Sequence, residues 1–110
     1  MYEQDIRLNW RAAIVLDNGR QVVHGRLQRL GRKKVVVCAD HNLSPGYRCN
    51  LAVMLPKSRA DETGIVVEAS ATIAASVLSA MQFYITLDRV TFEGRAQALL
   101  DERLRILGKM

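Results

Sequence analysis

The segment from Val22 to Pro56 constrains the fold most, because short runs of β-branched and leucine residues alternate there with glycine-containing turns. Glycines stand at positions 25, 31 and 46, between or beside these runs. β-Branched residues fit a pleated strand, and glycine permits the tight turns that join one strand to the next. The segment therefore predicts a small antiparallel sheet or barrel.

Six strands are expected along the chain, over residues 10–16, 21–27, 33–39, 48–55, 64–75 and 82–88. The Asp17-Asn18-Gly19 turn favours a hairpin between the first two, since these residue types tolerate a positive φ. Residues 29–32 are expected to form the next turn. Residues 48–55 alternate in polarity, with Cys49, Leu51, Val53 and Leu55 on one face. Six strands can close into a barrel, which removes the unpaired edges of the sheet.

From Thr91 onward the spacing of apolar residues changes from alternating to helical. Thr91 is the expected N-cap and Gly108 the expected end of the helix. One face carries the leucines at positions 99, 100, 104 and 107, and the opposite face carries Arg95, Asp101, Glu102, Arg103 and Arg105. Because an isolated helix of this length is marginal, we expect it to dock on the barrel or on a second copy of the chain.

The length of 110 residues and the hydrophobic fraction of 49% predict one domain over residues 1–110. The N-terminal residues lack the basic start and apolar core of a secretory signal, so a cytoplasmic location is expected. Residues 69–87 carry no charge and are long enough to cross a bilayer. Their serines and threonines, and the alternation over residues 65–73, favour a half-buried strand and no membrane insertion.

The cysteines and histidines predict neither a metal site nor a catalytic site. Cys38 and Cys49 are too few for a zinc site, and in the cytosol they should stay reduced. A hairpin around the loop 40–46 would place them opposite one another on one buried face. His24 and His41 are far apart in the sequence and have no nucleophile or metal ligand at a suitable spacing. We therefore expect a protein without catalytic residues, metal or cofactor.

The charge balance favours anionic partners. The chain has 16 basic and 11 acidic residues, and twelve of the basic ones are arginine, which contacts phosphate in a bidentate manner. Five basic residues fall within residues 26–34, so a small basic barrel that binds nucleic acid is an alternative function. No aromatic residue lies in that run to stack on bases, which makes nucleic acid the less favoured partner.

The order of strands and turns resembles the PilZ domain over about residues 10–90. The resemblance rests on LDNGRQVVHGRL, on VVVCADHNLSPGYRCNLAVMLP and on the two long strands after residue 64. It implies a six-stranded antiparallel β-barrel over about residues 10–90 and a C-terminal helix over about 91–107. It also implies a bacterial signalling domain, which either binds cyclic di-GMP or acts through protein partners in the regulation of motility, pili or surface behaviour.

Two sequence motifs bind cyclic di-GMP in those members of the PilZ family that are receptors for it. Arg7-Leu8-Asn9-Trp10-Arg11 has the Arg-x-x-x-Arg spelling of the first motif. The second, Asp/Asn-x-Ser-x-x-Gly, falls on residues 26–31, where Gly31 matches while Arg26 and Gln28 replace the acidic or amide residue and the serine. The resemblance thus implies a ligand site of Arg7, Arg11, Arg26, Gln28 and Gly31. The altered second motif leaves a nucleotide receptor and a protein-binding adaptor open as alternatives, and both are compatible with a homodimer.

Overall fold

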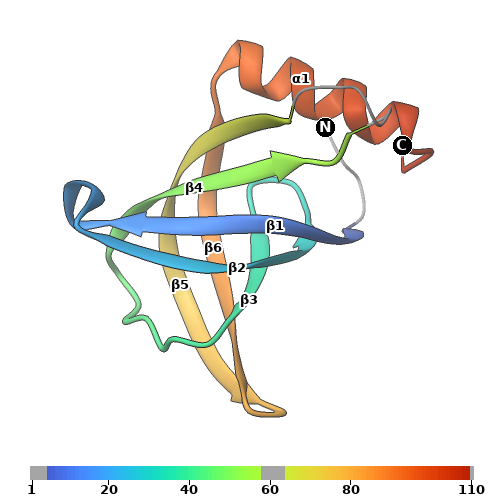
Figure 1. Cartoon of the computed structure of the whole chain (residues 1–110). Helices are drawn as coiled ribbons and strands as arrows, with labels where there is room; N and C mark the ends of the chain where they lie inside the picture. Colours follow the sequence, from blue (N-terminus) through green and yellow to red (C-terminus); the bar gives the residue numbers. More distant parts are fainter. Residues whose placement is uncertain (1–4, 58–63, 110) are drawn as a thin grey trace.

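A computed structural model describes residues 5–57 and 64–109 of the chain. Six antiparallel strands form a closed barrel in the order β1-β2-β3-β6-β5-β4, followed by one C-terminal helix (Figure 1). The elements are β1 (Ile6–Leu16), η1 (Asp17–Gly19), β2 (Gln21–Leu30), β3 (Val35–Ala39), β4 (Arg48–Leu55), β5 (Ile65–Ser79), β6 (Gln82–Phe92) and α1 (Gly94–Ile106). The predicted six-stranded antiparallel barrel with a C-terminal helix is confirmed.

Several strands are longer than the sequence pattern indicates. β1 begins at Ile6 rather than Trp10, because Ile6 and Arg7 already pair with Leu30 and Arg29 of β2. Consequently β2 continues to Leu30, and the predicted turn over residues 29–32 is wrong. The turn lies at residues 31–34, where the Gly31 N–H donates to the Lys34 carbonyl oxygen over 2.8 Å. The fifth and sixth strands also run further, to Ser79 and Phe92.

The barrel interior is filled by alternate residues of all six strands. Ile14, Leu27, Val37, Leu51 and Ile85 each have 0% of their surface exposed. The predicted inner face of β4 is confirmed, since Cys49, Leu51, Val53 and Leu55 are all buried. At Gly25, a Cβ atom would collide with the backbone carbonyl oxygen of Cys38 on the neighbouring strand β3. This glycine therefore permits the close approach of β2 and β3.

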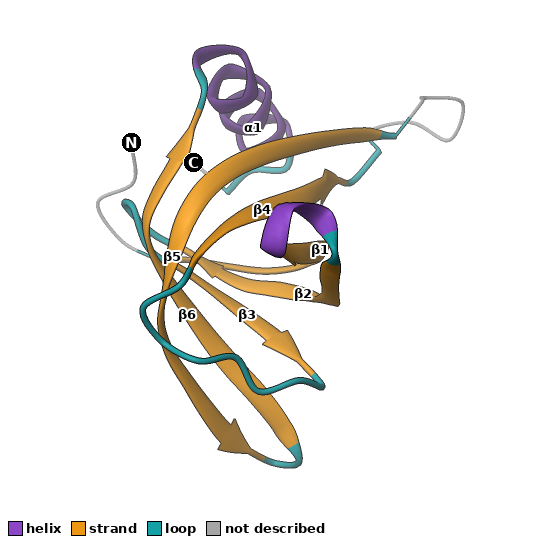
Figure 2. Ribbon diagram, turned by 90° about the vertical axis from the view of Figure 1, so that its left-hand side faces the viewer, coloured by secondary structure: helices purple, strands orange, loops and turns teal. Residues whose placement is uncertain are grey.

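Helix α1 closes one end of the barrel, where it lies beside β5 and β6 (Figures 1 and 2). Leu100 and Leu104 are completely buried and join the barrel core, whereas Leu107 is 38% exposed. Leu100 and Leu104 thus confirm the prediction that the helix docks on the barrel. Gly108 adopts a φ of +70° and ends the helix as predicted, and its N–H donates to the Arg105 carbonyl oxygen.

Two details of the predicted helix are wrong. Thr91 is not the N-cap, because it remains in β6 and pairs with Ser70 of β5, so the helix begins at Gly94 with Glu93 as its N-cap. Arg103, predicted on the solvent face, is only 7% exposed. It is one residue from the completely buried Leu104, so the buried side of the helix is wider than the leucine spacing indicates.

The connection between β3 and β4 crosses the opposite end of the barrel. β3 pairs with β2 and β6, and β4 pairs with β1 and β5, so the two strands are not neighbours. The predicted pairing of Cys38 with Cys49 is therefore wrong. Both thiols are free and buried, but Cys49 lies inside the barrel, whereas the Cys38 Sγ–H donates to Gln82 Oε1 on the outer face over 2.8 Å. Leu43, in the connection, is 5% exposed and plugs this end.

Among the described residues, no helix is long and apolar enough to span a membrane.

Candidate functional site

Four arginines form two rows on the outer surface of β1 and β2. Arg7 pairs with Arg29, and Arg11 pairs with Arg26, in the register of these two strands. All four side chains are exposed, while residues beside them in sequence, Leu8, Trp10, Leu27 and Leu30, point inward. We call Arg7, Arg11, Arg26 and Arg29 the arginine face. No described carboxylate forms an ion pair with any of the four.

A bulge in β2 explains how Arg26 and Arg29 come to lie on one surface. They are three residues apart, so in a regular strand they would point to opposite sides of the sheet. The register against β3 shifts between Leu27 and Arg29, which makes Gln28 the extra residue. A second shift, in the pairing of β1 with β2, lies between Arg7 and Trp10. Bulges re-aim side chains in this way, and here they direct both arginine pairs outward.

A hollow of about 550 Å³ lies beside the first arginine row. β1 and β2 contribute Arg7, Leu8, Gln28 and Arg29, and the next three strands contribute Val36, Thr86, Tyr84 and Val77. The register accounts for this set, since Arg29 pairs with Val36, Val36 with Thr86, and Tyr84 with Val77. The hollow thus has cations at one side, an aromatic ring and aliphatic groups at the other, and no acidic residue among those that line it.

The structure brings together four of the five site residues that the sequence predicts. Arg7 and Gln28 line the hollow, and Arg11 and Arg26 form the adjoining row of the arginine face. Gly31 lies apart from the hollow and is buried, and the space that a Cβ atom would need there is taken by the Asp5 carboxylate. Gly31 therefore has a packing role in the turn between β2 and β3.

Sequence reasoning missed Arg29 and Tyr84. The sequence pattern puts Arg29 in a turn, and only the bulge at Gln28 would have indicated its outward direction. Tyr84 is distant in sequence from the basic residues 26–34 and reaches them through the neighbour relation of β3 with β6. The alternation of Phe83, Ile85 and Leu87 was the available signal, because it leaves Tyr84 on the outer face of its strand.

The chemistry of this surface suits a phosphate-bearing ring compound. Guanidinium groups bind phosphate oxygens in a bidentate manner and stack on planar rings. The Tyr84 ring offers a second flat surface, and the Gln28 amide can both donate to and accept from the edge of a base. Since no described carboxylate neutralises the arginines, the surface has a positive potential toward a diffusing anion.

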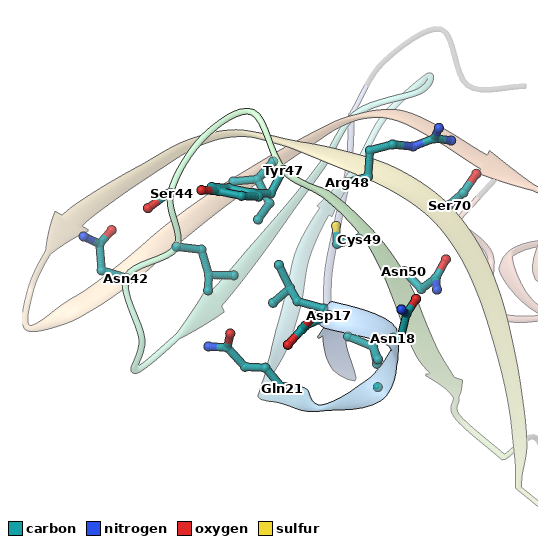
Figure 3. Close-up of a pocket in the computed structure, with 15 residues that line it drawn as sticks. Asp17, Asn18, Gln21, Asn42, Ser44, Tyr47, Arg48, Cys49, Asn50 and Ser70 are labelled. Carbon is teal, nitrogen blue, oxygen red and sulfur yellow. The ribbon is translucent and has the colours of Figure 1, made fainter.

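A larger hollow of about 850 Å³ lies between η1 and the β3–β4 connection (Figure 3). Its lining is polar, with Asn18, Asn42 and Asn50 among several amide and hydroxyl side chains. Arg48 is its one basic residue and Asp17 its one acidic residue. The side chains of Asn42 and Arg48 point away from one another in Figure 3. With balanced charge and no predicted site residue, this hollow is less suited to a dianion than the arginine face.

The described titratable groups give no sign of a metal centre, since no three of His, Cys, Asp or Glu among them lie close enough to share an ion. Burial inside the barrel raises the pKa of the Cys49 thiol from 9.0 to about 11. This thiol is therefore protonated at neutral pH, where a reactive cysteine would need to be a thiolate.

Comparison with known proteins finds a similar structure but no similar sequence. No protein-family model and no curated protein matches this sequence. Among solved structures, the Bacillus subtilis inhibitor of motility MotI/DgrA superposes with a TM-score of 0.64 at 18% sequence identity. The match covers 96% of this chain and 51% of that chain, so this chain spans about half the length of the motility inhibitor. At this identity the similarity shows a shared fold.

Proposed function

We propose that this chain is a PilZ-like signalling domain whose arginine face binds a cyclic dinucleotide, with cyclic di-GMP as the ligand implied by the resemblance. The observation that carries the proposal is the pairing of Arg7 with Arg29 and of Arg11 with Arg26 beside a hollow walled by Tyr84. Strand register, rather than proximity in sequence, assembles this cluster. Such an arrangement matches a flat ligand with two phosphates.

Each side chain has a distinct part in this proposal. Arg7 and Arg29 hold one phosphate at the hollow, and Arg11 with Arg26 holds the second along the adjoining row. One guanine stacks on an arginine plane or on the Tyr84 ring, and Gln28 hydrogen-bonds to its edge. The amide and the cation at positions 28 and 26 thus take the places of the serine and the acidic or amide residue in the second motif.

A regulatory role without catalysis is part of the same proposal. It is supported by the similarity to a protein described as an inhibitor of motility. The adaptor function, in which the domain acts through a protein partner without nucleotide, is favoured by one observation. Gly31, the residue that matches the second motif, packs on Asp5 away from the hollow, so no intact form of that motif lines the site.

Calorimetric titration with cyclic di-GMP tests the nucleotide proposal. Replacing Arg7 or Arg29 by Ala should weaken binding about 10- to 150-fold, the range expected for loss of a charge-assisted hydrogen bond. Arg48→Ala is the matched control, since Arg48 is also exposed but borders the other hollow. Absence of heat at high micromolar ligand, or equal losses in all three variants, would reject the nucleotide site and leave the adaptor function.

Nucleic acid is the second ligand class to compare in the same experiment. The exposed Arg32, Lys33 and Lys34 in the β2–β3 turn continue the positive surface beyond Arg29, and Tyr84 supplies the aromatic ring that the basic run lacks. Titration with a single-stranded oligonucleotide at two salt concentrations separates the two classes. A nucleic-acid module should bind the oligonucleotide with affinity that falls steeply with salt and should ignore cyclic di-GMP.

A further inference from the structure

The β3–β4 connection crosses the end of the barrel from which the β5–β6 hairpin projects (Figures 1 and 2). Between this connection and η1 lies the hollow of about 850 Å³, which we call the polar hollow (Figure 3). Its floor is apolar and buried, since Leu43, Cys49 and Ile73 are each at most 6% exposed. Its rim consists mainly of exposed polar side chains. An apolar floor beneath convergent polar groups, in a volume of about 300–1,000 Å³, is typical of a site for a small molecule.

Two walls of the polar hollow are held in fixed backbone conformations. In the β3–β4 connection, the Gly46 N–H donates to the Ile73 carbonyl oxygen over 2.8 Å, and the Ile73 N–H donates to the Tyr47 carbonyl oxygen over 2.9 Å. In η1, Asp17 and Asn18 occupy the left-handed region with φ values of 52° and 54°. Residues other than glycine that are held in this region cluster at active sites and ligand clamps. The hollow is therefore formed before any ligand arrives.

The polar side chains of the rim are available to a ligand and have no net charge. Within the part of the chain that the structure describes, the side chains of Asp17, Gln21 and Asn50 have no hydrogen-bond partner. The lining contains three asparagines and one glutamine, whose amides both donate and accept hydrogen bonds. Asp17 and Arg48 are the only charged residues of the lining, and their charges cancel. These properties favour an uncharged ligand that carries many donors and acceptors.

Tyr47 adds an aromatic surface to the hollow. Its side chain is 63% exposed, more than any other aromatic side chain in the described part of the chain. Figure 3 shows its ring in the β3–β4 connection, across the hollow from Asp17 and Gln21. The face of an aromatic ring carries partial negative charge and attracts C–H groups, which are weakly positive. A saturated ring with C–H groups on its face and hydroxyl groups on its edge fits between this surface and the polar wall.

We propose that the polar hollow binds an uncharged carbohydrate of about the size of a disaccharide. One sugar ring packs its C–H face on Tyr47 and directs its hydroxyl groups to Asp17 and Gln21. The second ring extends along the rim, where the amides of Asn18 and Asn50 donate to and accept from its hydroxyl groups. The polar hollow shares no residue with the arginine face or the hollow beside it, so the carbohydrate and a nucleotide bind independently.

Nuclear magnetic resonance of the nitrogen-15-labelled full chain tests the carbohydrate site and locates it. Cellobiose, maltose, lactose and mannobiose are titrated separately, up to tens of millimolar. At least one of them should shift the amide resonances of residues 17–21 and 42–50 in a saturable manner and leave those of Arg7 and Arg29 in place. Cyclic di-GMP should give the reverse pattern, so failure at one site is distinguished from failure at the other. No saturable shift at residues 17–21 and 42–50 with any of the four sugars overturns the proposal.

Substitutions at the rim test the part of each side chain. Tyr47→Ala should weaken binding of that sugar about 5- to 30-fold, whereas Tyr47→Phe, which keeps the ring, should stay within about 3-fold of the wild type. Gln21→Ala should weaken binding about 3- to 10-fold, the range for one neutral hydrogen bond. Asn9→Ala is the matched control, because Asn9 is an exposed amide on β1 that lines neither hollow. Unchanged binding in Tyr47→Ala, or an equal loss in Asn9→Ala, overturns the proposal.

Discussion

The two ends of the barrel differ in how far their apolar residues are buried. At the helix end, α1 covers the core and leaves Leu100 and Leu104 with no exposed surface. At the hairpin end, only Leu43 of the β3–β4 connection is inserted, and Leu78 and Met81 remain exposed on the projecting tip. Both ends have comparable apolar side chains. The difference shows that burial depends on whether another element is present to cover the residue.

The helix end should lose far more stability than the hairpin end when one leucine is truncated. We expect Leu100→Ala to lower the free energy of unfolding by about 2–4 kcal/mol, since it leaves a cavity in a packed core. Leu78→Ala, measured in dilute protein, should change it by less than about 0.5 kcal/mol, as is usual for exposed sites. Urea unfolding followed by circular dichroism measures both.

Leu107→Ala is the control for a nonspecific loss of helix, because Leu107 is 38% exposed and follows the last turn of α1. Its cost should stay below about 1 kcal/mol. Equal costs at positions 78 and 100 would contradict the contrast between the two ends.

The barrel wall between the two ends should tolerate less change than the hairpin tip. Gly25→Ala forces a Cβ against the backbone carbonyl oxygen of Cys38, and the backbone must move to relieve it. We expect a loss of about 1–3 kcal/mol in the free energy of unfolding, the range for overpacking. Gly64→Ala, where a Cβ would meet nothing within 4 Å, should change stability by less than about 0.5 kcal/mol. Equal thermal shifts for both variants would show that β2 and β3 can separate freely.

The sequence predicts the parts of this molecule that depend on local alternation and turn chemistry. The inner faces of β4 and β6, the turn at residues 17–19 and the helix end at Gly108 follow from such local signals. Strand order does not, because the pairing of β3 with β6 joins residues about fifty positions apart in the chain. This is why the sequence pattern puts Cys38 and Cys49 opposite one another, although they lie on different sides of the barrel wall.

The arginine face shows the same division between local and nonlocal information. The spacing of Arg7 and Arg11 identifies them as candidates, and their ligand role stays a prediction. Arg29 required knowledge of the bulge at Gln28, which appears only in the register of β2 against β3. Tyr84 required the strand order. A site assembled by register across several strands leaves only fragments of its pattern in the sequence.

A sharper test of the hairpin end concerns the strain in its turn. Ala80 and Met81 occupy the left-handed region, which costs about 1 kcal/mol or more for a residue other than Gly, Asn or Asp. An asparagine followed by a glycine suits a two-residue turn of this kind, because both tolerate a positive φ. The double substitution Ala80→Asn with Met81→Gly should therefore raise the free energy of unfolding, measured in urea, by about 1 kcal/mol.

The other hairpin supplies the control for this test, because Asn18 already has a suitable side chain at φ 54°. Asn18→Gly should change the free energy of unfolding by only a few tenths of a kcal/mol. If the double substitution at positions 80 and 81 lowers stability, the turn is not strained in the isolated chain.

The smallest expected effect is the contribution of the Cys49 thiol to the pH dependence of the free energy of unfolding. Cys49 lies beneath the β3–β4 connection at the hairpin end. Burial raises the pKa of its thiol from 9.0 to about 11. A raised pKa means that the folded state holds the proton more tightly than the unfolded state does. The stability that the protonated thiol contributes is therefore fully present below about pH 9 and is lost as the pH rises toward about 11. The wild-type chain should therefore lose more stability between about pH 8.5 and about pH 10.5 than Cys49→Ala does, when both are unfolded by urea at each pH. Parallel curves for the two proteins would show that the thiol is reached by water in the folded state. The hairpin end would then be more open than the 5% exposure of Leu43 indicates.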